Sequence, residues 1–441
     1  MQNHSEKIPL WRQLQATAEV VASVNAGASG TLALESVDAN LRPGVQALAF
    51  HVWRNLGRAQ ALRKLLAPKA PPAAADALLS TALALAWNES NTVYDAFTLV
   101  NQAVEAAKRS PHTRAQASFI NACLRRFLRE RANLVLRTDA DLTAVWNHPQ
   151  WWIQRLQKEY PQNWESILSA ANSQAPLTLR VNTRLGTVAN YIETLKIAGS
   201  DAIANGACGI DLANPIAVHR LPAFADGKVS VQDGAAQMAA PLLLKHLAGS
   251  EPLRLLDACA APGGKTGHLL ELSNARVLAL DIDPKRCQRI SENLARIHVN
   301  ATVVVADAAH PDSWWDGELF DGILLDAPCT ASGIVRRHPD VRWLRRESDI
   351  AQLALLQAKI LKALWPLVKP GGVLLFCTCS IFHAEGHDQV QTFLAHNTDA
   401  TLLPSPGHLA PQNAAKLRDV QDNQPRDHDG FFYALLQKGV A

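Results

Sequence analysis

The sequence predicts a Rossmann-like α/β domain over residues 246–441, preceded by an all-α domain over residues 1–140 and a small α/β module over residues 141–245. Two patterns predict this arrangement. After about residue 250, short apolar runs typical of strands alternate with helical segments, which indicates a mostly parallel, doubly wound sheet. Before about residue 140, apolar residues recur every three or four positions, which indicates amphipathic helices.

The composition is that of a globular protein. Of the 441 residues, 48% are hydrophobic and 19% are charged, and 43 Lys and Arg against 40 Asp and Glu give a net charge of only +3. Any basic surface is therefore local. No apolar signal region follows the N-terminus, no apolar run approaches the length of a membrane span, and seven scattered cysteines do not form a disulfide framework. We expect a cytoplasmic monomer that does not bind membranes.

The N-terminal segment is expected to form a bundle of about five helices. Apolar residues follow helical spacing from Val45 to Leu56 and again from Ala117 to Phe127. The Pro/Ala-rich residues 67–73 are expected to connect two helices. The last helix carries arginines that could bind RNA phosphates or could simply form a solvated face: Arg125, Arg126 and Arg129.

The middle module combines tryptophans with basic residues. Interleaved aromatic and basic side chains can stack on unpaired bases, but tryptophans more often pack between structural elements. Strands are predicted at residues 177–181 and 216–221, with a helix between them. The tryptophans are Trp146, Trp151, Trp152 and Trp164.

A turn of small residues follows the predicted strand 254–258 and precedes a helix. Glycines let a bound molecule approach the backbone, and amides at the helix N-terminus remain free to bind it. A Walker loop would need Gly where Cys259 stands, and no G-x-G-x-x-G run fits. We expect a ligand here, the alternative being a tight turn without one. The turn comprises Cys259, Ala260, Ala261, Pro262, Gly263, Gly264 and Lys265.

The strands predicted after this turn also end in polar or reactive residues. They span 276–283, 301–307, 320–326 and 372–379, with 430–437 as a closing antiparallel hairpin strand. Because the carboxyl ends of parallel strands meet at one edge, where open α/β sheets bind ligands, we expect one crevice to hold the end residues. In chain order these are Asp281 or Asp283, Asp307, Asp326 with Cys329, and Cys379.

The acids at these strand ends indicate a nucleoside ligand. A carboxylate after the second strand can accept hydrogen bonds from ribose hydroxyls. S-adenosylmethionine fits best because it has ribose and adenine but no phosphate that would require the missing glycine loops. Asp307 would then meet the adenine. The alternative for each aspartate is a cap on the next helix.

Two of the cysteines stand in a reactive context. A thiol beside Lys or Arg becomes a nucleophile, and Lys265, Arg336 and Arg337 are candidate neighbours of Cys329 and Cys379. Addition of a thiolate at carbon 6 of a pyrimidine makes an enamine that can attack an electrophilic methyl group, and a second group must help to release the product. The remaining cysteines are expected to pack in the interior: Cys123, Cys208, Cys259, Cys287 and Cys377.

A metal site is a weaker interpretation of the same region. Cys377, Cys379, His383 and His387 could supply four ligands. The two cysteines are too close in sequence for the usual C-x2–4-C clamp. We therefore expect no metal.

An arginine-rich tract follows the first of the two reactive cysteines. Its position predicts that it rims the crevice and holds a phosphate backbone, with Trp343 beside it. Ion pairing with Asp340 and Glu347 is the alternative. The arginines are Arg336, Arg337, Arg342, Arg345 and Arg346.

Three motifs together resemble the RNA (cytosine-5) methyltransferase family, also called the NOL/NOP2/Sun family. They are Cys-Ala-Ala-Pro-Gly-Gly-Lys at 259–265, Asp-Ala-Pro-Cys at 326–329 and Thr-Cys-Ser at 378–380. The N-terminal helices look like a NusB-type RNA-binding domain, and residues 148–182 look like the family's linker and RNA-binding module. This domain order resembles that of bacterial members that act on 16S (small-subunit) ribosomal RNA. DNA enzymes carry a Glu-Asn-Val motif that is missing from this chain.

The resemblance implies a class I methyltransferase domain that binds S-adenosyl-L-methionine through residues 259–265 and the three strand-end aspartates Asp281, Asp307 and Asp326. It implies that Cys379 is the nucleophile of a covalent Cys–cytosine intermediate and that Cys329 assists its breakdown. Asp326 would contact the cytosine ring and Lys265 would lie near the reaction centre. The target base would have to be unstacked.

The implied activity is methylation of carbon 5 of a cytosine in 16S rRNA, free or in an immature small subunit. Methylation of tRNA or another RNA, or a non-catalytic RNA-binding assembly factor, are the alternatives. A nucleotide-dependent oxidoreductase or ATPase is disfavoured by the glycine pattern. One segment departs from the family: after Thr-Cys-Ser, relatives usually continue with a Pro-Glu-Glu-Asn-like run, whereas this chain has His383-Ala384-Glu385-Gly386.

Overall fold

The computed structural model describes residues 8–91, 93–247, 252–411 and 427–440. Its contacts divide the chain into two compact units. The helical unit comprises residues 1–172 and 335–347, and the α/β unit comprises residues 173–334 and 348–441. A segment from the middle of the C-terminal half thus packs with the N-terminal helices. The boundaries at 140 and 245 stay a prediction.

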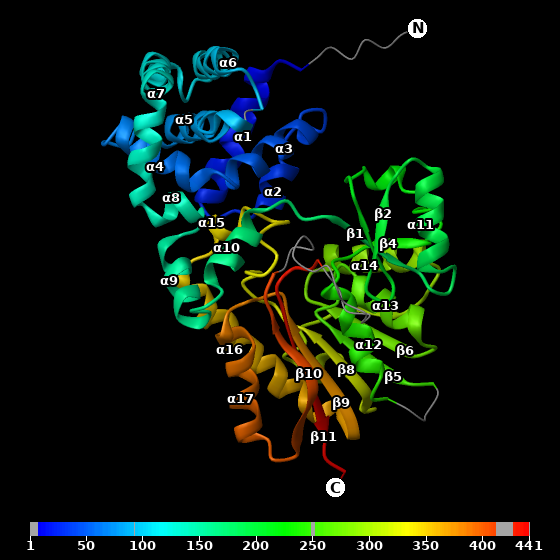
Figure 1. Ribbon diagram of the computed structural model, residues 1–441. Helices are drawn as coiled ribbons and strands as arrows, with labels where there is room; N and C mark the ends of the chain where they lie inside the picture. The colour runs from blue at the N-terminus through cyan, green and yellow to red at the C-terminus, as the bar shows by residue number, and fades with distance from the viewer. Residues whose placement is uncertain (1–7, 92, 248–251, 412–426, 441) are drawn as a thin grey trace. The chain divides into compact units, whose positions relative to one another are not determined.

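The helical unit is built from more helices than the five or so expected (Figure 1). Turns separate these helices, and polar side chains in the turns cap two of them, the second and the sixth. Ser29 accepts a hydrogen bond from the amide of Leu32, and Asp95 accepts one from the amide of Thr98. The helices are α1 (Leu10–Asn25), α2 (Gly30–Glu35), α3 (Arg42–Trp53), α4 (Leu56–Leu66), α5 (Ala73–Ala86), α6 (Ala96–Arg109) and α7 (Ala117–Arg137).

The tryptophan-rich region also packs in the helical unit. It forms α8 (Leu142–Trp146), α9 (Gln150–Glu159) and α10 (Trp164–Asn172). Trp152 is buried, and the ring centroids of Trp146 and Trp164 lie 5.1 Å apart in an edge-on arrangement. These contacts favour the packing interpretation over base stacking.

The α/β unit begins with a small antiparallel sheet of strand order β2-β3-β1-β4. The strand predicted at 216–221 is wrong. Prolines flank this segment at 215 and 222, and its amides instead make local bonds in a short 3₁₀ helix, Val218–Arg220. The elements are β1 (Leu177–Val181), α11 (Val188–Ile197), β2 (Ala202–Asn205), β3 (Gly209–Leu212) and β4 (Val229–Val231).

A seven-stranded sheet of order β10-β11-β9-β8-β5-β6-β7 follows, and it confirms the predicted Rossmann-like fold. The strands from β9 to β7 in this order run parallel, and β11 is antiparallel to both β9 and β10. β10 was not predicted, because two prolines and a bulge interrupt its pattern, which an edge strand tolerates. The strands are β5 (Arg254–Ala258), β6 (Arg276–Asp281), β7 (Thr302–Val305), β8 (Phe320–Asp326), β9 (Val368–Thr378), β10 (Ala400–Leu409) and β11 (Phe431–Lys438).

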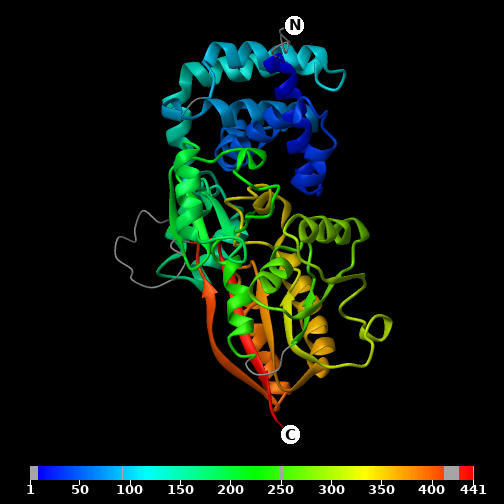
Figure 2. The same cartoon turned by 90° about the vertical axis from the view of Figure 1, so that its right-hand side faces the viewer.

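Helices cover both faces of this sheet (Figures 1 and 2). Alternate strand residues enter two separate cores: Leu255 and Leu324 lie in one, and Leu256 and Ile323 lie in the other. The first core is closed by α12 (Ala239–Leu244), α13 (Gly264–Leu272) and α14 (Pro284–Arg296), and the second by α16 (Glu347–Leu364) and α17 (His387–His396).

One described segment, Glu347–Leu367, is long and apolar enough to cross a membrane by length and composition. The expectation that no apolar run approaches that length is therefore wrong. Ile360, Leu361 and Leu364 of α16 are buried against the sheet. The helix is apolar because one side of it lies in the core of the fold.

Candidate active site at the carboxyl edge of the sheet

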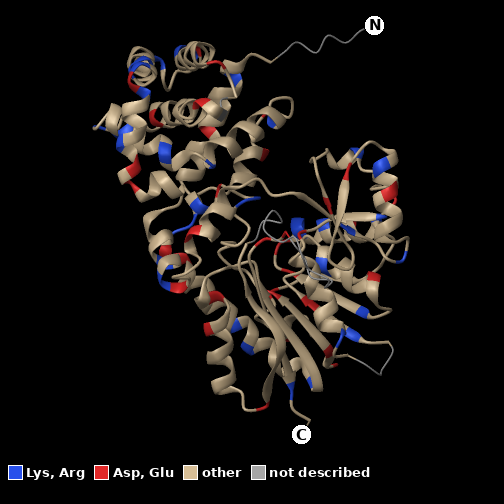
Figure 3. Cartoon of the chain, in the orientation of Figure 1, with Lys and Arg blue, Asp and Glu red and all other residues tan. Residues whose placement is uncertain are grey.

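The predicted cofactor turn is anchored to the end of the neighbouring strand. After β5, Cys259 has a φ of 63° and Gly263 a φ of 92°, and α13 starts at the next residue. The amide of Ala260 donates to the Leu280 carbonyl at 2.7 Å. The amide of Ala261 donates to Oδ2 of Asp281 at 3.2 Å. The turn is thus held at the carboxyl edge, where acidic residues gather (Figure 3).

Asp281 and Asp283 have different tasks. Asp283 caps α14, since its side chain accepts hydrogen bonds from the amides of Lys285 and Arg286. Asp281 is buried and holds the cofactor turn. The helix-cap interpretation therefore applies to Asp283. Asp307 follows β7, and its side chain is 37% exposed.

An unpredicted acid, Asp257, lies inside β5. Its side chain is fully buried; Oδ2 accepts a hydrogen bond from Thr266 Oγ1 at 2.6 Å, and Oδ1 has no partner among the described residues. Burial raises the pKa of Asp257 to about 7. The sequence signal that could have identified Asp257 was an acidic residue inside an otherwise apolar strand.

Lys265 and Asp326 form an ion pair at this edge. Nζ of Lys265 lies 2.6 Å from Oδ2 of Asp326, and Oδ1 of Asp326 accepts a weak hydrogen bond from Cys377. Burial by itself would lower the pKa of Lys265, but the charge of Asp326 raises it above its ordinary value. Lys265 is therefore a cation that α13 places beside the end of β8.

The two reactive cysteines lie together. Sγ of Cys329 is 3.4 Å from Sγ of Cys379, because β8 and β9 are neighbouring parallel strands; Cys379 follows β9 directly, and Cys329 lies in the loop that follows β8. The hydrogen bond between them and desolvation raise the pKa of Cys329. Cys329 is thus favoured as the thiol that donates to Cys379. We call residues 327–333 and 379–382 the cysteine loops.

The chain matches known protein families over most of its length. Residues 244–437 match the family described as 16S rRNA methyltransferase RsmB/F, residues 148–219 match its ferredoxin-like domain, and residues 13–129 match the NusB family. The chain is 39% identical over 424 residues to the ribosomal RNA small subunit methyltransferase B of Vibrio cholerae, covering 94% of each chain.

The chain belongs to the 16S rRNA methyltransferase RsmB/F family. It is also 40% identical to the ribosomal RNA small subunit methyltransferase B of Pasteurella multocida, covering 90% of this chain and 89% of the relative. Among solved structures, that of PH0851 is 25% identical with a TM-score of 0.76, covering 98% of this chain and 99% of that one. The family resemblance inferred from the three motifs is confirmed.

Part of the arginine-rich tract that follows Cys329 is buried in this protein. We call residues 335–347 the arginine segment; it includes α15 (Val341–Leu344) and belongs to the helical unit. Arg336 and Arg342 are fully buried. Arg342 donates to the carbonyls of Asn147, Ala171 and Val335 and to the side chain of Asn172.

These contacts correct the expectation that all five arginines line an RNA-binding rim. The buried side chains of Arg336 and Arg342 present no surface to a phosphate in this conformation. Burial also lowers the pKa of Arg342 to about 9. Arg337 is partly exposed, and its RNA contact stays a prediction.

The arginines of α7 remain accessible. Arg125 donates to Asn121, and Arg126 pairs with Glu130 one turn away, at 3.1 Å. The Arg126 side chain is 42% exposed. Pairs of this kind are weak, so they leave the arginines free to exchange partners, and their predicted RNA contact stays open.

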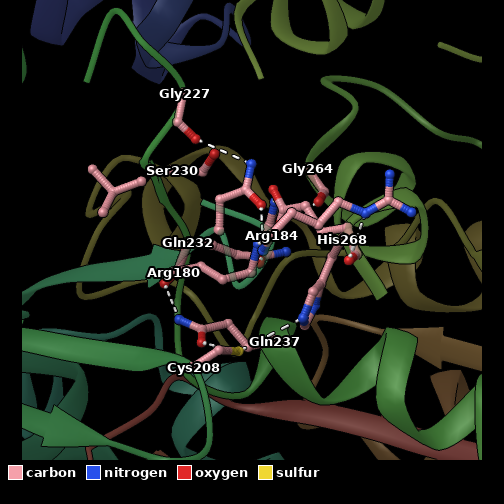
Figure 4. Close-up of polar contacts among 12 residues, drawn as sticks. Arg180, Arg184, Cys208, Gly227, Ser230, Gln232, Gln237, Gly264 and His268 are labelled. Carbon is pink, nitrogen blue, oxygen red and sulfur yellow. Dashed lines mark hydrogen bonds and ion pairs between the residues drawn. The ribbon is translucent and has the colours of Figure 1, made fainter. Parts of the chain in front are cut away.

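A hub around Arg180 was not assigned from the sequence. Its guanidinium pairs with both carboxylate oxygens of Glu271 on α13, at 2.7 and 2.9 Å. It also donates to Gln232 and to the carbonyl of Gly264, at 2.5 and 2.7 Å; Figure 4 labels these two residues beside Arg180. Arg180 thus joins the small sheet to the cofactor turn. The only sequence signal for this hub was that the segments around residues 180 and 232 resemble the family. Their spacing did not reveal what these residues do.

Figure 4 also shows Cys208 beside Gln237 and His268. Burial raises the pKa of Cys208 to about 11, which fits the packing role expected for it. Burial likewise raises the pKa of Cys377. A raised pKa disfavours the thiolate form, so neither thiol is a candidate nucleophile.

Gly386, where the sequence departs from the family's Pro-Glu-Glu-Asn-like run, packs closely against His408. A Cβ at this position would lie 2.6 Å from the imidazole of His408, so a larger residue does not fit. Nε2 of His408 accepts a hydrogen bond from the amide of His387 at 3.3 Å, at the start of α17. A side chain from β10 thereby satisfies a helix-terminal amide that Gly386 cannot cap.

Proposed function

We propose that this protein transfers a methyl group from S-adenosylmethionine to carbon 5 of a cytosine in 16S rRNA, free or in an immature small subunit. The observation that carries the proposal is the pair of cysteines, with sulfur atoms 3.4 Å apart, in the same unit as the Lys265–Asp326 ion pair. The names of the relatives support the rRNA substrate. We place this activity in a cytoplasmic monomer without membrane or DNA partners.

The residues at the carboxyl edge fit S-adenosylmethionine. The turn from Cys259 to Lys265 leaves the N-terminal amides of α13 for a carboxylate, while Asp281 and Asp307 follow the next two strands. A carboxylate-rich edge repels phosphates and suits a ligand with ribose hydroxyls and positive charge. When bound, S-adenosylmethionine supplies an electrophilic methyl group. The unpartnered Oδ1 of Asp257 adds a polar group beneath the turn.

The cysteines then divide the chemistry. The Cys379 thiolate adds to carbon 6 of the cytosine and makes carbon 5 nucleophilic. Asp326 lies where it can accept a hydrogen bond from the ring, and Lys265 holds that carboxylate in place. Once Cys379 is bonded to carbon 6, Cys329 no longer donates to a thiolate and gives its own proton to solvent. After methylation the Cys329 thiolate takes the proton of carbon 5, the bond between carbon 6 and Cys379 breaks with its electron pair returning to sulfur, and the ring double bond re-forms.

The proposal is tested by transfer of tritiated methyl from S-adenosylmethionine to unmodified small-subunit rRNA and to immature particles. We expect the label in 5-methylcytidine when the product nucleosides are separated. A parallel assay offers tRNA as the acceptor, and label only in tRNA would show that tRNA is the substrate. Cofactor binding without label on any RNA would favour a non-catalytic RNA-binding factor.

The role of Cys329 is tested by Cys329→Ala. We expect a protein–RNA adduct that survives a denaturing gel, because the alanine cannot take the proton whose loss allows release. The wild type is expected to show no stable adduct. Equal adduct levels in the two proteins would contradict the assignment.

A further inference from the structure

Glu385 connects the two cysteine loops through its carboxylate. It lies in the short 3₁₀ helix His383–Glu385, and its side chain is fully buried. Its carboxylate accepts hydrogen bonds from the amide and hydroxyl of Thr330 at 2.8 and 2.5 Å and from the hydroxyl of Ser380 at 2.6 Å. Gln357 of α16 donates a fourth, at 3.2 Å.

The partners of Glu385 stand directly beside the reacting groups. Thr330 follows Cys329 and Ser380 follows Cys379 in the sequence. The two loops are also joined by a hydrogen bond between Ser332 and Ser380 at 2.9 Å. One carboxylate therefore fixes the chain next to both cysteines, which come from different strands.

A carboxylate suits this task better than a neutral group. Ionised, it offers about four acceptor sites and no donor, which matches the four donors around Glu385. Among the described residues, no Lys or Arg pairs with it. Burial raises the pKa of Glu385, whereas its hydrogen bonds lower it. Burying a carboxylate without a cation is costly, so stability alone is a weak reason for this arrangement.

We propose that Glu385 is a positioning residue that sets the separation of Cys329 and Cys379 through Thr330 and Ser380. This inference rests on the cysteine roles proposed above. The two sulfur atoms must act on adjacent ring carbons, one at carbon 6 and one on the proton of carbon 5. A shift of one loop against the other would disturb both steps without touching the cofactor turn.

The test is Glu385→Gln, with the exposed Glu292→Gln as a control for loss of one charge. The amide replaces one carboxylate oxygen, and so about two of the four acceptor sites, with an NH2 group that only donates. We expect kcat to fall about 30-fold, while KM for S-adenosylmethionine and for RNA changes less than about twofold. The control should keep wild-type constants. An unchanged kcat, or a loss that appears only in KM, would overturn the proposal.

A double-mutant cycle with Ser380→Ala separates positioning from general damage. If Glu385 acts through Ser380, the double variant should lose less than the product of the two single losses. Independent, multiplicative losses would contradict the proposal. If Glu385→Gln does not fold, the same cycle is run with Thr330→Val, which removes the hydroxyl that donates to Glu385, and Ser380→Ala; both variants keep the carboxylate. Full turnover in Cys379→Ala would instead show that the cysteine roles themselves are wrong.

Discussion

The cysteine loops and the arginine segment use polar side chains in opposite ways. Around the cysteine loops, buried Glu385, Thr330 and Ser380 hold two thiols that remain partly exposed. In the arginine segment, Arg336 and Arg342 are themselves buried. The difference teaches that a polar side chain identifies a site only where the fold leaves it accessible and uses other groups to support it.

The largest expected effect breaks the chemistry without affecting the fold. Cys379→Ala should lower turnover at least about 1000-fold, because it removes the thiol that we propose adds to the ring. Its cofactor affinity and thermal midpoint should stay near those of the wild type. The matched control is Cys287→Ala, a buried cysteine on α14, which should keep turnover. Residual turnover above about one tenth in Cys379→Ala would mean that another residue is the nucleophile.

Arg342→Met should lower the stability of the fold without removing a group that takes part in the proposed chemistry. It leaves three carbonyls and the Asn172 side chain without their donor, at a cost of about 3 kcal/mol in the free energy of unfolding. Urea titration followed by tryptophan fluorescence measures the change. Arg346→Met, on an exposed residue, should shift it by less than about 0.5 kcal/mol. Equal shifts in both variants would remove the distinction between buried and exposed arginines in this segment.

Arg180→Lys sharpens the comparison inside the α/β unit. Lysine keeps the charge beside Glu271 but loses the paired geometry and the bond to the Gly264 carbonyl. We expect KM for S-adenosylmethionine to rise about tenfold, or about 1.4 kcal/mol, with little change in kcat. Arg184→Lys is the control, since Arg184 contacts the other end of α13 at Ser273 and Asn274. A similar KM in both variants would argue against a role for Arg180 at the turn.

The smallest expected effect concerns the accessible arginines of α7. Arg126→Gln should weaken rRNA binding about threefold at low salt and reduce the salt slope by about one, if Arg126 contacts a phosphate. Arg109→Gln on α6 removes a similar i,i+4 pair, with Glu105, and serves as the control. Filter binding at several salt concentrations measures both. Identical slopes would assign the α7 arginines to a solvated face.

The sequence by itself determined the fold class and predicted which groups are reactive. Apolar runs alternating with helices indicate a parallel sheet, and such a sheet must gather its strand ends at one edge; Asp281, Asp326, Cys329 and Cys379 follow from that rule. The glycine turn before α13 is equally local, since few residue types can occupy a φ of 92°.

Only the tertiary structure decided which polar residues support the site. Arg180 reaches Glu271 across 91 positions, and Glu385 reaches Thr330 across 55. Such partners share neither a helix nor a strand, so no periodicity connects them. The same holds for Arg342, which looks like a surface residue in sequence and is buried by contacts with residues 147–172. Burial depends on which distant segments meet, and hydropathy patterns within one segment do not record that.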